Sequence, residues 1–240
     1  MSTRRTATLV ALVMLIPIAL PLVPTAAAAA VGSPTLPTFF NYVAPSTVGN
    51  GALEPTLGVN WATGNVMWMQ GTRVFRVTFN DNLATPAATW TGVKPLNSIV
   101  NADPMLVLNP YTGRTYAGGL DGPCSVMSYS DDDGATWTPT GNMCSGTIDH
   151  QTLVEGPWAG GKPAAAIHNM AVYYCAQLSA IACSTSMDGG LTWLPPVAVG
   201  GPCFSLHGHL NVSPSGVAYL PVKNCGSGLQ GYAWTTNNGL

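Results

Sequence analysis

An eight-residue pattern, Ser-x-Asp-x-Gly-x-Thr-Trp, occurs twice in the chain and constrains its fold more than any other feature. The two copies are Ser130–Trp137 and Ser186–Trp193. A third copy opens at Thr235–Leu240, with Thr in place of Ser and Asn in place of Asp, and the sequence ends before a Thr-Trp pair. A pattern that recurs at this length indicates a chain built from similar structural units.

The residues of this repeat have the chemistry of a tight hairpin turn. Short Ser and Asp side chains can bond to backbone N–H groups, Gly can take a positive φ, and Trp can fold back as an apolar plug. We therefore expect the acidic residues of both copies to have structural rather than catalytic roles. They are Asp131, Asp132, Asp133 and Asp188.

On these residues the repeat resembles the Asp-box, or bacterial neuraminidase (BNR) repeat, of sialidases and other secreted β-propellers. In that family the box lies on a peripheral hairpin of the blade. The resemblance implies an all-β fold, a β-propeller of four-stranded blades, with about four blades in residues 51–240 and the last one truncated. Because propellers close on themselves and the family has six or seven blades, we expect this sequence to be a fragment of a longer protein.

A second, less regular repeat supports this division into blades. At each blade start an ionisable residue stands three positions before a Leu, and the starts are about 50 residues apart, which suits four-stranded blades. Asp149 is an alternative to His150 as the start of the third blade. Strand-like runs such as 66–69 and 74–79 lie within the units, and none of the chain after residue 30 has convincing helical periodicity. The four starts are Glu54, Asp103, His150 and His207.

In a propeller the first strand of each blade lines the central axis, and ligands usually bind where those strands begin. The four blade starts should therefore ring one mouth of the axis, with Asp149 and His209 beside them and the pair 168–169 near by. Carboxylates and imidazoles crowded into one pocket are the groups that acid–base catalysis uses. Our candidate catalytic residues are Asp103, Asp149, His150, Glu54, His207 and His209.

Each of these candidates also has a structural interpretation. An acidic residue at a strand start can cap backbone N–H groups, and a single His is often an ordinary polar residue. His207 and His209 are two positions apart, which places both imidazoles on one face of a strand and, with Asp149 and His150, offers a metal site as an alternative. Two-residue His spacing is a weak signal, so we expect no metal and no other cofactor.

The N-terminus has the three zones of a secretory signal peptide, which we assign to residues 1–30. A charged tip at Arg4-Arg5 precedes an apolar run over 7–20 and small residues over 26–30. The run contains Pro17 and is shorter than a membrane-spanning helix needs, so we expect secretion to the extracellular space without stable membrane insertion. Residues 31–50 are expected to form an N-terminal extended segment.

The amino-acid composition limits the kinds of partner and the cellular compartment that we expect for the protein. Only 8% of residues are charged and the net charge is −2, so no basic surface is available for nucleic acid. Six cysteines in an exported chain predict three disulfides. Pairing between neighbours in the sequence is the simplest scheme, and it gives Cys124–Cys144, Cys175–Cys183 and Cys203–Cys225.

The functional expectation follows from the resemblance and from where the chain departs from it. Sialidases use three arginines, a Tyr nucleophile activated by Glu, and an Asp acid–base, whereas here only Arg73, Arg76 and Arg114 follow residue 30 and strand packing is expected for Tyr173 and Tyr174. The first hypothesis is a secreted sialidase-like, glycan-active protein, an exo-glycosidase that hydrolyses terminal sugars. The alternatives are a non-catalytic carbohydrate-binding or adhesion propeller and a structural extracellular protein. In the first two, the partner is a glycan or glycoconjugate.

Overall fold

Antiparallel β-structure accounts for nearly all regular structure in the computed structural model, which describes residues 39–48, 54–95, 103–144, 149–177, 180–199, 201, 206–226 and 228–240. Residues Phe40–Leu240 form one compact unit. The predicted signal peptide and residues 31–38 and 49–50 lie outside the described residues, and the described part of the N-terminal segment contains a short 3-10 helix, η1 (Ser46–Val48). Within the described part, no helix has the length and apolar character needed to cross a membrane.

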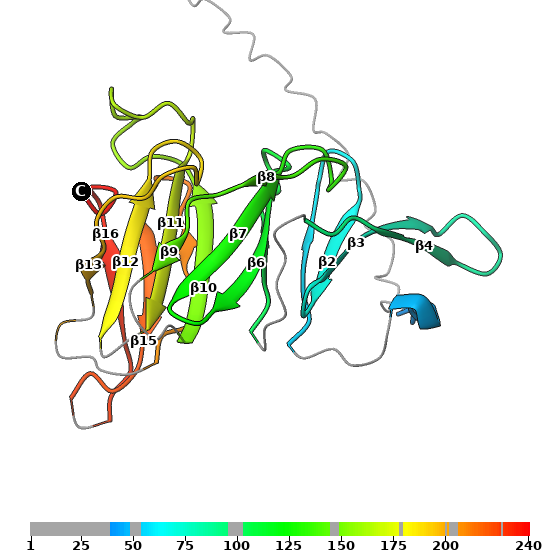
Figure 1. Cartoon of the computed structure of the whole chain (residues 1–240), viewed down its shortest axis with the longest axis horizontal. Coiled ribbons are helices and arrows are strands. Elements are labelled where there is room, and N and C mark those ends of the chain that lie inside the picture. The colour runs from blue at the N-terminus through cyan, green and yellow to red at the C-terminus, as the bar shows by residue number, and fades with distance from the viewer. Residues whose placement is uncertain are drawn as a thin grey trace, which may run out of the picture. The chain divides into compact units, whose positions relative to one another are not determined.

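The strands form four sheets that follow one another along the chain, as the propeller prediction requires (Figure 1). The first sheet contains β1 (Thr56–Val59), β2 (Val66–Gln70), β3 (Arg73–Asn80) and β4 (Ala87–Gly92). The second contains β5 (Met105–Leu108), β6 (Thr115–Asp121), β7 (Cys124–Ser130) and β8 (Thr138–Pro139), with β9 (Met143–Cys144) also paired to β7.

The third and fourth sheets repeat this up-and-down order. The third contains β10 (Asp149–Gly156), β11 (Ala171–Gln177), β12 (Ile181–Ser186) and β13 (Val197–Ala198). The fourth contains β14 (Asn211–Val212), β15 (Ala218–Val222) and β16 (Gly231–Thr235). The all-β fold class and the four-unit division are therefore confirmed: each sheet is one antiparallel meander, as in a propeller blade.

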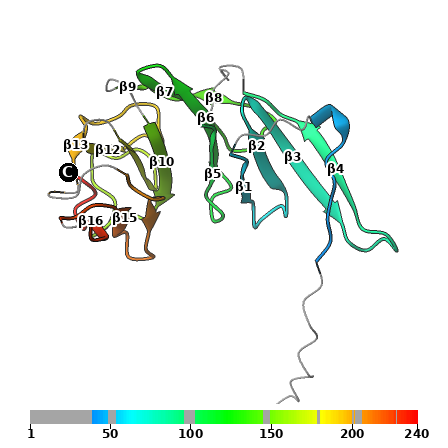
Figure 2. The ribbon, with the colours of Figure 1, turned by 90° about the horizontal axis from the view of Figure 1, so that it is seen from below.

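The first strands of successive sheets are neighbours: β1 contacts β5 (Figure 2), β5 contacts β10, and β10 contacts β14. Two glycines permit this approach. A Cβ at Gly58 would lie 2.5 Å from Cβ of Leu108, and one at Gly156 would lie 2.6 Å from Cβ of Val212. These inner strands therefore bring the four blade starts toward one end of a shared surface.

Each pair of neighbouring sheets encloses an apolar core. The core between the first and second sheets includes Met67 and Leu106, the next includes Met127 and Leu153, and the last includes Leu220. Because β11 faces a core on both sides, its residues 171–176 are all buried, which explains the unbroken apolar run in its sequence. Two predicted disulfides are confirmed within single sheets, Cys124–Cys144 and Cys175–Cys183. Cys225 is also disulfide-bonded, and Cys203 lies outside the described residues.

The three octapeptide copies fold into the same turn. In the first, Gly134 N donates to Ser130 Oγ over 2.8 Å, and Thr136 N donates to Asp132 Oδ1 over 2.8 Å. The second copy repeats these bonds from the Gly190 and Thr192 amides at 2.8 Å each. In the third, Gly239 N donates to Thr235 Oγ1 over 2.9 Å. The structural role predicted for Asp132 and Asp188 is thus confirmed.

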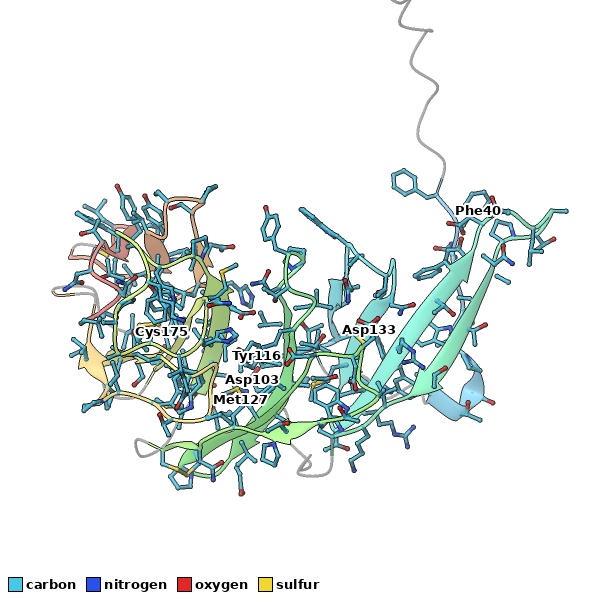
Figure 3. All side chains as sticks on the ribbon, turned by 90° about the horizontal axis from the view of Figure 1, so that it is seen from above. Phe40, Asp103, Tyr116, Met127, Asp133 and Cys175 are labelled. Carbon is cyan, nitrogen blue, oxygen red and sulfur yellow. A yellow bond between two sulfur atoms is a disulfide. The ribbon has the colours of Figure 1, made fainter. Side chains whose placement is uncertain are left out.

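The fourth residue of each copy has a positive φ and reaches across to the preceding blade. The carboxylate of Asp133 (Figure 3), at φ 51°, accepts from Asn60 Nδ2 over 2.7 Å and from Asn65 Nδ2 over 2.6 Å. Asn238, at φ 64°, accepts from Ala159 N over 2.7 Å. In the second copy the backbone carbonyl of Gly189 connects the two blades, accepting from the Tyr116 hydroxyl over 3.2 Å. The octapeptide turns therefore also connect neighbouring blades, and we call this contact between blades the latch.

Candidate functional site

The candidate residues precede or begin the four inner strands, as the second sequence repeat predicted. Glu54 lies two residues before β1, Asp103 two before β5, and His209 two before β14, while Asp149 and His150 open β10. The backbone supports the alignment of the repeats, because Glu54 and His150 both have positive φ, 47° and 51°. Left-handed backbone is rare for residues other than Gly and is concentrated at functional sites.

A cavity of about 1140 Å³ extends along the inner strands. Glu54, Asp103, His150 and His209 line it at the end where these strands begin. The other end is lined by groups that include Tyr111, Glu155 and Pro214. Four of the six candidates therefore lie on the wall of one cavity.

The carboxyl group of Asp103, which is labelled in Figure 3, is hydrogen-bonded to that of Glu54. Burial raises the pKa of the Asp103 carboxyl above its usual value, and the negative charge of Glu54 and the hydrogen bond with it raise the pKa further. A backbone hydrogen bond from Gln151 and the positive charge that His150 can carry act in the opposite direction. An acid that keeps its proton at higher pH is suited to donating that proton in a reaction.

The histidines form a second cluster beside this pair. The ring of His150 lies 5.0 Å from that of His207 and 6.3 Å from that of His209, measured between centroids. His207 is 3% exposed, and this burial lowers its pKa, an effect that neighbouring His150 and His209 strengthen. Its Nδ1 lies 2.9 Å from the carbonyl oxygen of Gly208, while its Nε2 has no hydrogen-bond partner among the described residues.

Two candidates stand apart from the cavity wall. His207 is buried behind His150, so it contacts the site without lining the cavity. Asp149 is exposed and its Oδ1 accepts from the His150 amide over 2.9 Å, so it stabilises the local turn. The metal alternative has no geometric support, because within the described ranges no group of three or more His, Cys, Asp or Glu side chains could hold a metal ion.

His168 lies at the opposite end of β10 from the site. Its Nε2 is 2.5 Å from Oε1 of Glu155, whose side chain is fully buried. Asn169 accepts from Lys162 Nζ over 3.2 Å. The expectation that His168 and Asn169 would lie near the candidate catalytic residues is therefore wrong. The segment before β11 lies at the end of β10 that contains Glu155, whereas the candidate residues lie at the end where β10 begins.

The arginines and tyrosines weighed for a sialidase-type site make other contacts. Arg73 donates to Val48 O over 2.8 Å, and Arg76 to Asp133 O over 3.5 Å. Arg114 forms two 2.7 Å bonds with the Asp131 carboxylate at the Asp-box end of the blade. Both Tyr173 and Tyr174 lie in β11, and burial raises the pKa of each phenol to about 12. Strand packing, the role expected for the two tyrosines, is confirmed.

Sequence reasoning missed a buried polar network behind Asp103. Gln151 donates from Nε2 to the Asp103 carbonyl oxygen over 2.8 Å. Ser125 hydrogen-bonds both to Oε1 of Gln151 and to the Tyr174 hydroxyl. Ser125 and Tyr174 lie outside both repeats, and Gln151 occupies a position of the blade-start repeat that the pattern leaves unspecified. A polar residue at a buried strand position was the one available signal.

Comparison with known proteins found structural matches but no match by sequence. No protein-family model matches the chain, and no curated protein matches it by sequence. The chain is structurally similar to a mutant of NanB sialidase from Streptococcus pneumoniae, with a TM-score of 0.42, 13% identity, and coverage of 75% of this chain and 31% of that one. A second structure, NanB with Optactamide, gives a TM-score of 0.39, 11% identity, and coverage of 70% and 29%.

The chain therefore spans about a third of the length of these sialidase structures. The class that its own strand order defines is a β-propeller of consecutive antiparallel sheets with Asp-box turns, in which the described sheets have three to five strands.

Proposed function

We propose that the protein is a secreted, sialidase-like glycoside hydrolase that removes terminal sugars from extracellular glycans. The observation that carries this proposal is the hydrogen-bonded pair Glu54–Asp103 on the wall of a cavity that His150 also lines. The two disulfides agree with an oxidising, extracellular compartment. The Asp-box resemblance connects the fold with proteins that act on glycans.

The chemistry assigned to the pair is proton transfer. Protonated Asp103 donates its proton to the glycosidic oxygen as the bond between that oxygen and the anomeric carbon breaks. The Glu54 carboxylate stabilises the positive charge that develops on the sugar ring, because glycoside hydrolysis passes through an oxocarbenium-like transition state. Water then bonds to the anomeric carbon and gives a proton to the His150 imidazole, from which it returns to Asp103 through solvent.

Glu54 and Asp103 act here as one unit. Paired carboxyls that work on opposite sides of a sugar are separated by about 5 Å or more, whereas these two share a hydrogen bond. The pair therefore supplies the acid, and a group elsewhere on the cavity wall must supply the base. His150 fits that role because its ring lies at the same end of the cavity.

The test is hydrolysis of a panel of sialosides and neutral glycosides by the purified protein and by Asp103→Asn. Removing a general acid lowers rates by about 10²–10⁴-fold, so the variant should lose at least about 100-fold in kcat. Asp121→Asn, which changes an exposed carboxylate at the end of β6, is the matched control and should retain activity. Equal turnover by the Asp103 variant and the control would refute the assignment.

A non-catalytic carbohydrate-binding propeller is the second candidate. It is favoured by one observation: Arg73, Arg76 and Arg114 are all bonded outside the cavity, so they are not placed to grip a substrate carboxylate in it. Glycan binding that survives in Asp103→Asn, without turnover by either protein, would select this candidate.

A further inference from the structure

The third blade begins irregularly beside Asp103. The register of β10 against β11 shifts between Asp149 and Thr152, and His150 within this bulge has a φ of 51°. Bulges bend a strand and redirect the groups that follow them. Here the residue that follows is Gln151, which is 6% exposed although its side chain is polar.

Gln151 forms two hydrogen bonds with Asp103. Its backbone hydrogen-bonds to the Asp103 carboxyl group. Its side-chain Nε2 donates to the Asp103 carbonyl oxygen over 2.8 Å. Two bonds from one residue restrict both the main chain of Asp103 and the direction in which its carboxyl points. They also connect the second blade to the third, because Asp103 precedes β5 and Gln151 belongs to β10.

The Gln151 amide is itself fixed from behind. Ser125, on β7, donates to Gln151 Oε1 and shares a hydrogen bond with the Tyr174 hydroxyl of β11. Ser125 is 0% and Tyr174 2% exposed, so water cannot replace either partner. A buried polar network in which each member is satisfied is rigid, and losing one member leaves the others unpaired.

We propose that Gln151 is a positioning residue that orients the Asp103 carboxyl for proton transfer, with Ser125 and Tyr174 holding its amide in place. This inference deepens the proposed function, since it rests on Asp103 being the acid. It explains why a Gln occupies a buried strand position immediately after a left-handed residue.

The network also adjusts the proton affinity of Asp103. The titratable groups that act on Asp103 are Glu54, which raises its pKa, and His150, which lowers it, while Tyr174 lies close enough for the two groups to interact. A hydrogen bond to the ionised carboxylate favours that form, so the backbone bond from Gln151 counteracts burial and Glu54. Loosening Gln151 should therefore raise the pKa of Asp103.

The experiment is an NMR titration of the Asp103 side-chain carboxyl in the full chain, for the native protein, Gln151→Leu and Ser125→Ala. We expect the pKa of Asp103 to rise by about one unit in Gln151→Leu and by less in Ser125→Ala. The milder Ser125 variant keeps the test valid if Gln151→Leu does not fold. Ser184→Ala, which removes another buried Ser hydroxyl that donates to Leu194 O over 3.0 Å, is the matched control.

An Asp103 pKa that is unchanged in both variants, with stability lowered as in Ser184→Ala, would overturn the proposal and leave the network a purely structural role. If the protein hydrolyses glycosides, the alkaline limb of its kcat–pH profile, where Asp103 loses its proton, should move with the same pKa. Because the titration needs no turnover, the positioning role and the proposed function can fail separately.

Discussion

At the scale of single residues, the surroundings of Asp103 change the proton affinity of its carboxyl. Burial and Glu54 raise the pKa of its carboxyl above the reference value of 3.8. The folded state therefore binds this proton more tightly than the unfolded state does. The resulting contribution to stability is complete below about pH 3.8 and is lost as pH rises through the folded-state pKa. Above the folded-state pKa this contribution is absent, and the ionised carboxyl is disfavoured by burial and by the charge of Glu54.

Replacing Asp103 by Asn should therefore stabilise the protein near neutral pH. Asn keeps an acceptor for the Gln151 backbone but cannot ionise beside Glu54. In urea unfolding at pH 7, Asp103→Asn should have a midpoint equal to or above that of the native protein, and the difference should shrink by pH 4. A variant that is less stable at pH 7 but not at pH 4 would show that Asp103 serves mainly as a structural cap.

Among the elements, the Asp-box turns connect the blades. Asp133 accepts two bonds from the turn between β1 and β2, and the indole nitrogen of Trp137 donates to Val93 O over 2.6 Å. Trp193 repeats the bond to Gly141 O over 2.9 Å. The repeated octapeptide thus serves twice, first by closing a hairpin and then by attaching that hairpin to the blade before it.

Losing the latch should weaken the protein more than losing a bond within the hairpin. Asp133→Ala leaves the buried Asn60 amide without its partner and should cost about 2–4 kcal/mol of unfolding free energy, whereas Asp132→Ala, in the exposed part of the turn, should cost about 1 kcal/mol. Denaturant unfolding measures both. Hydrogen exchange of the 60–65 turn should accelerate in Asp133→Ala alone, and equal acceleration in both variants would contradict the latch.

The sequence predicted the elements better than it predicted the contacts around the site. Both repeats carry regular signals, so the four sheets, the turns and the positions of Glu54, Asp103 and His150 followed from them. The Gln151 network did not, because a bulge has no periodic signature and hydrogen bonds between blades join residues far apart in sequence. His168 was misplaced for the same reason: its partner Glu155 becomes visible once the path of the chain between β10 and β11 is known.

Across the whole molecule, the contacts between blades form both the apolar cores and the candidate site. Each apolar core lies between two neighbouring sheets, and the residues of the candidate site come from the starts of several blades. Residues 1–30 as a signal peptide and the pairing Cys203–Cys225 stay predictions. We propose that separate blades contribute to one coupled acid–base site.

The most direct test of that claim is the Asp103 pKa measured by NMR in the native protein and in Glu54→Gln, a substitution that keeps the shape of the side chain and removes its charge. We expect a native pKa above the reference 3.8 and a lower pKa in the variant, because the charge of Glu54 in the first blade raises the pKa of Asp103 in the second. The same pKa in both proteins would contradict it, since the two carboxyls would then titrate independently.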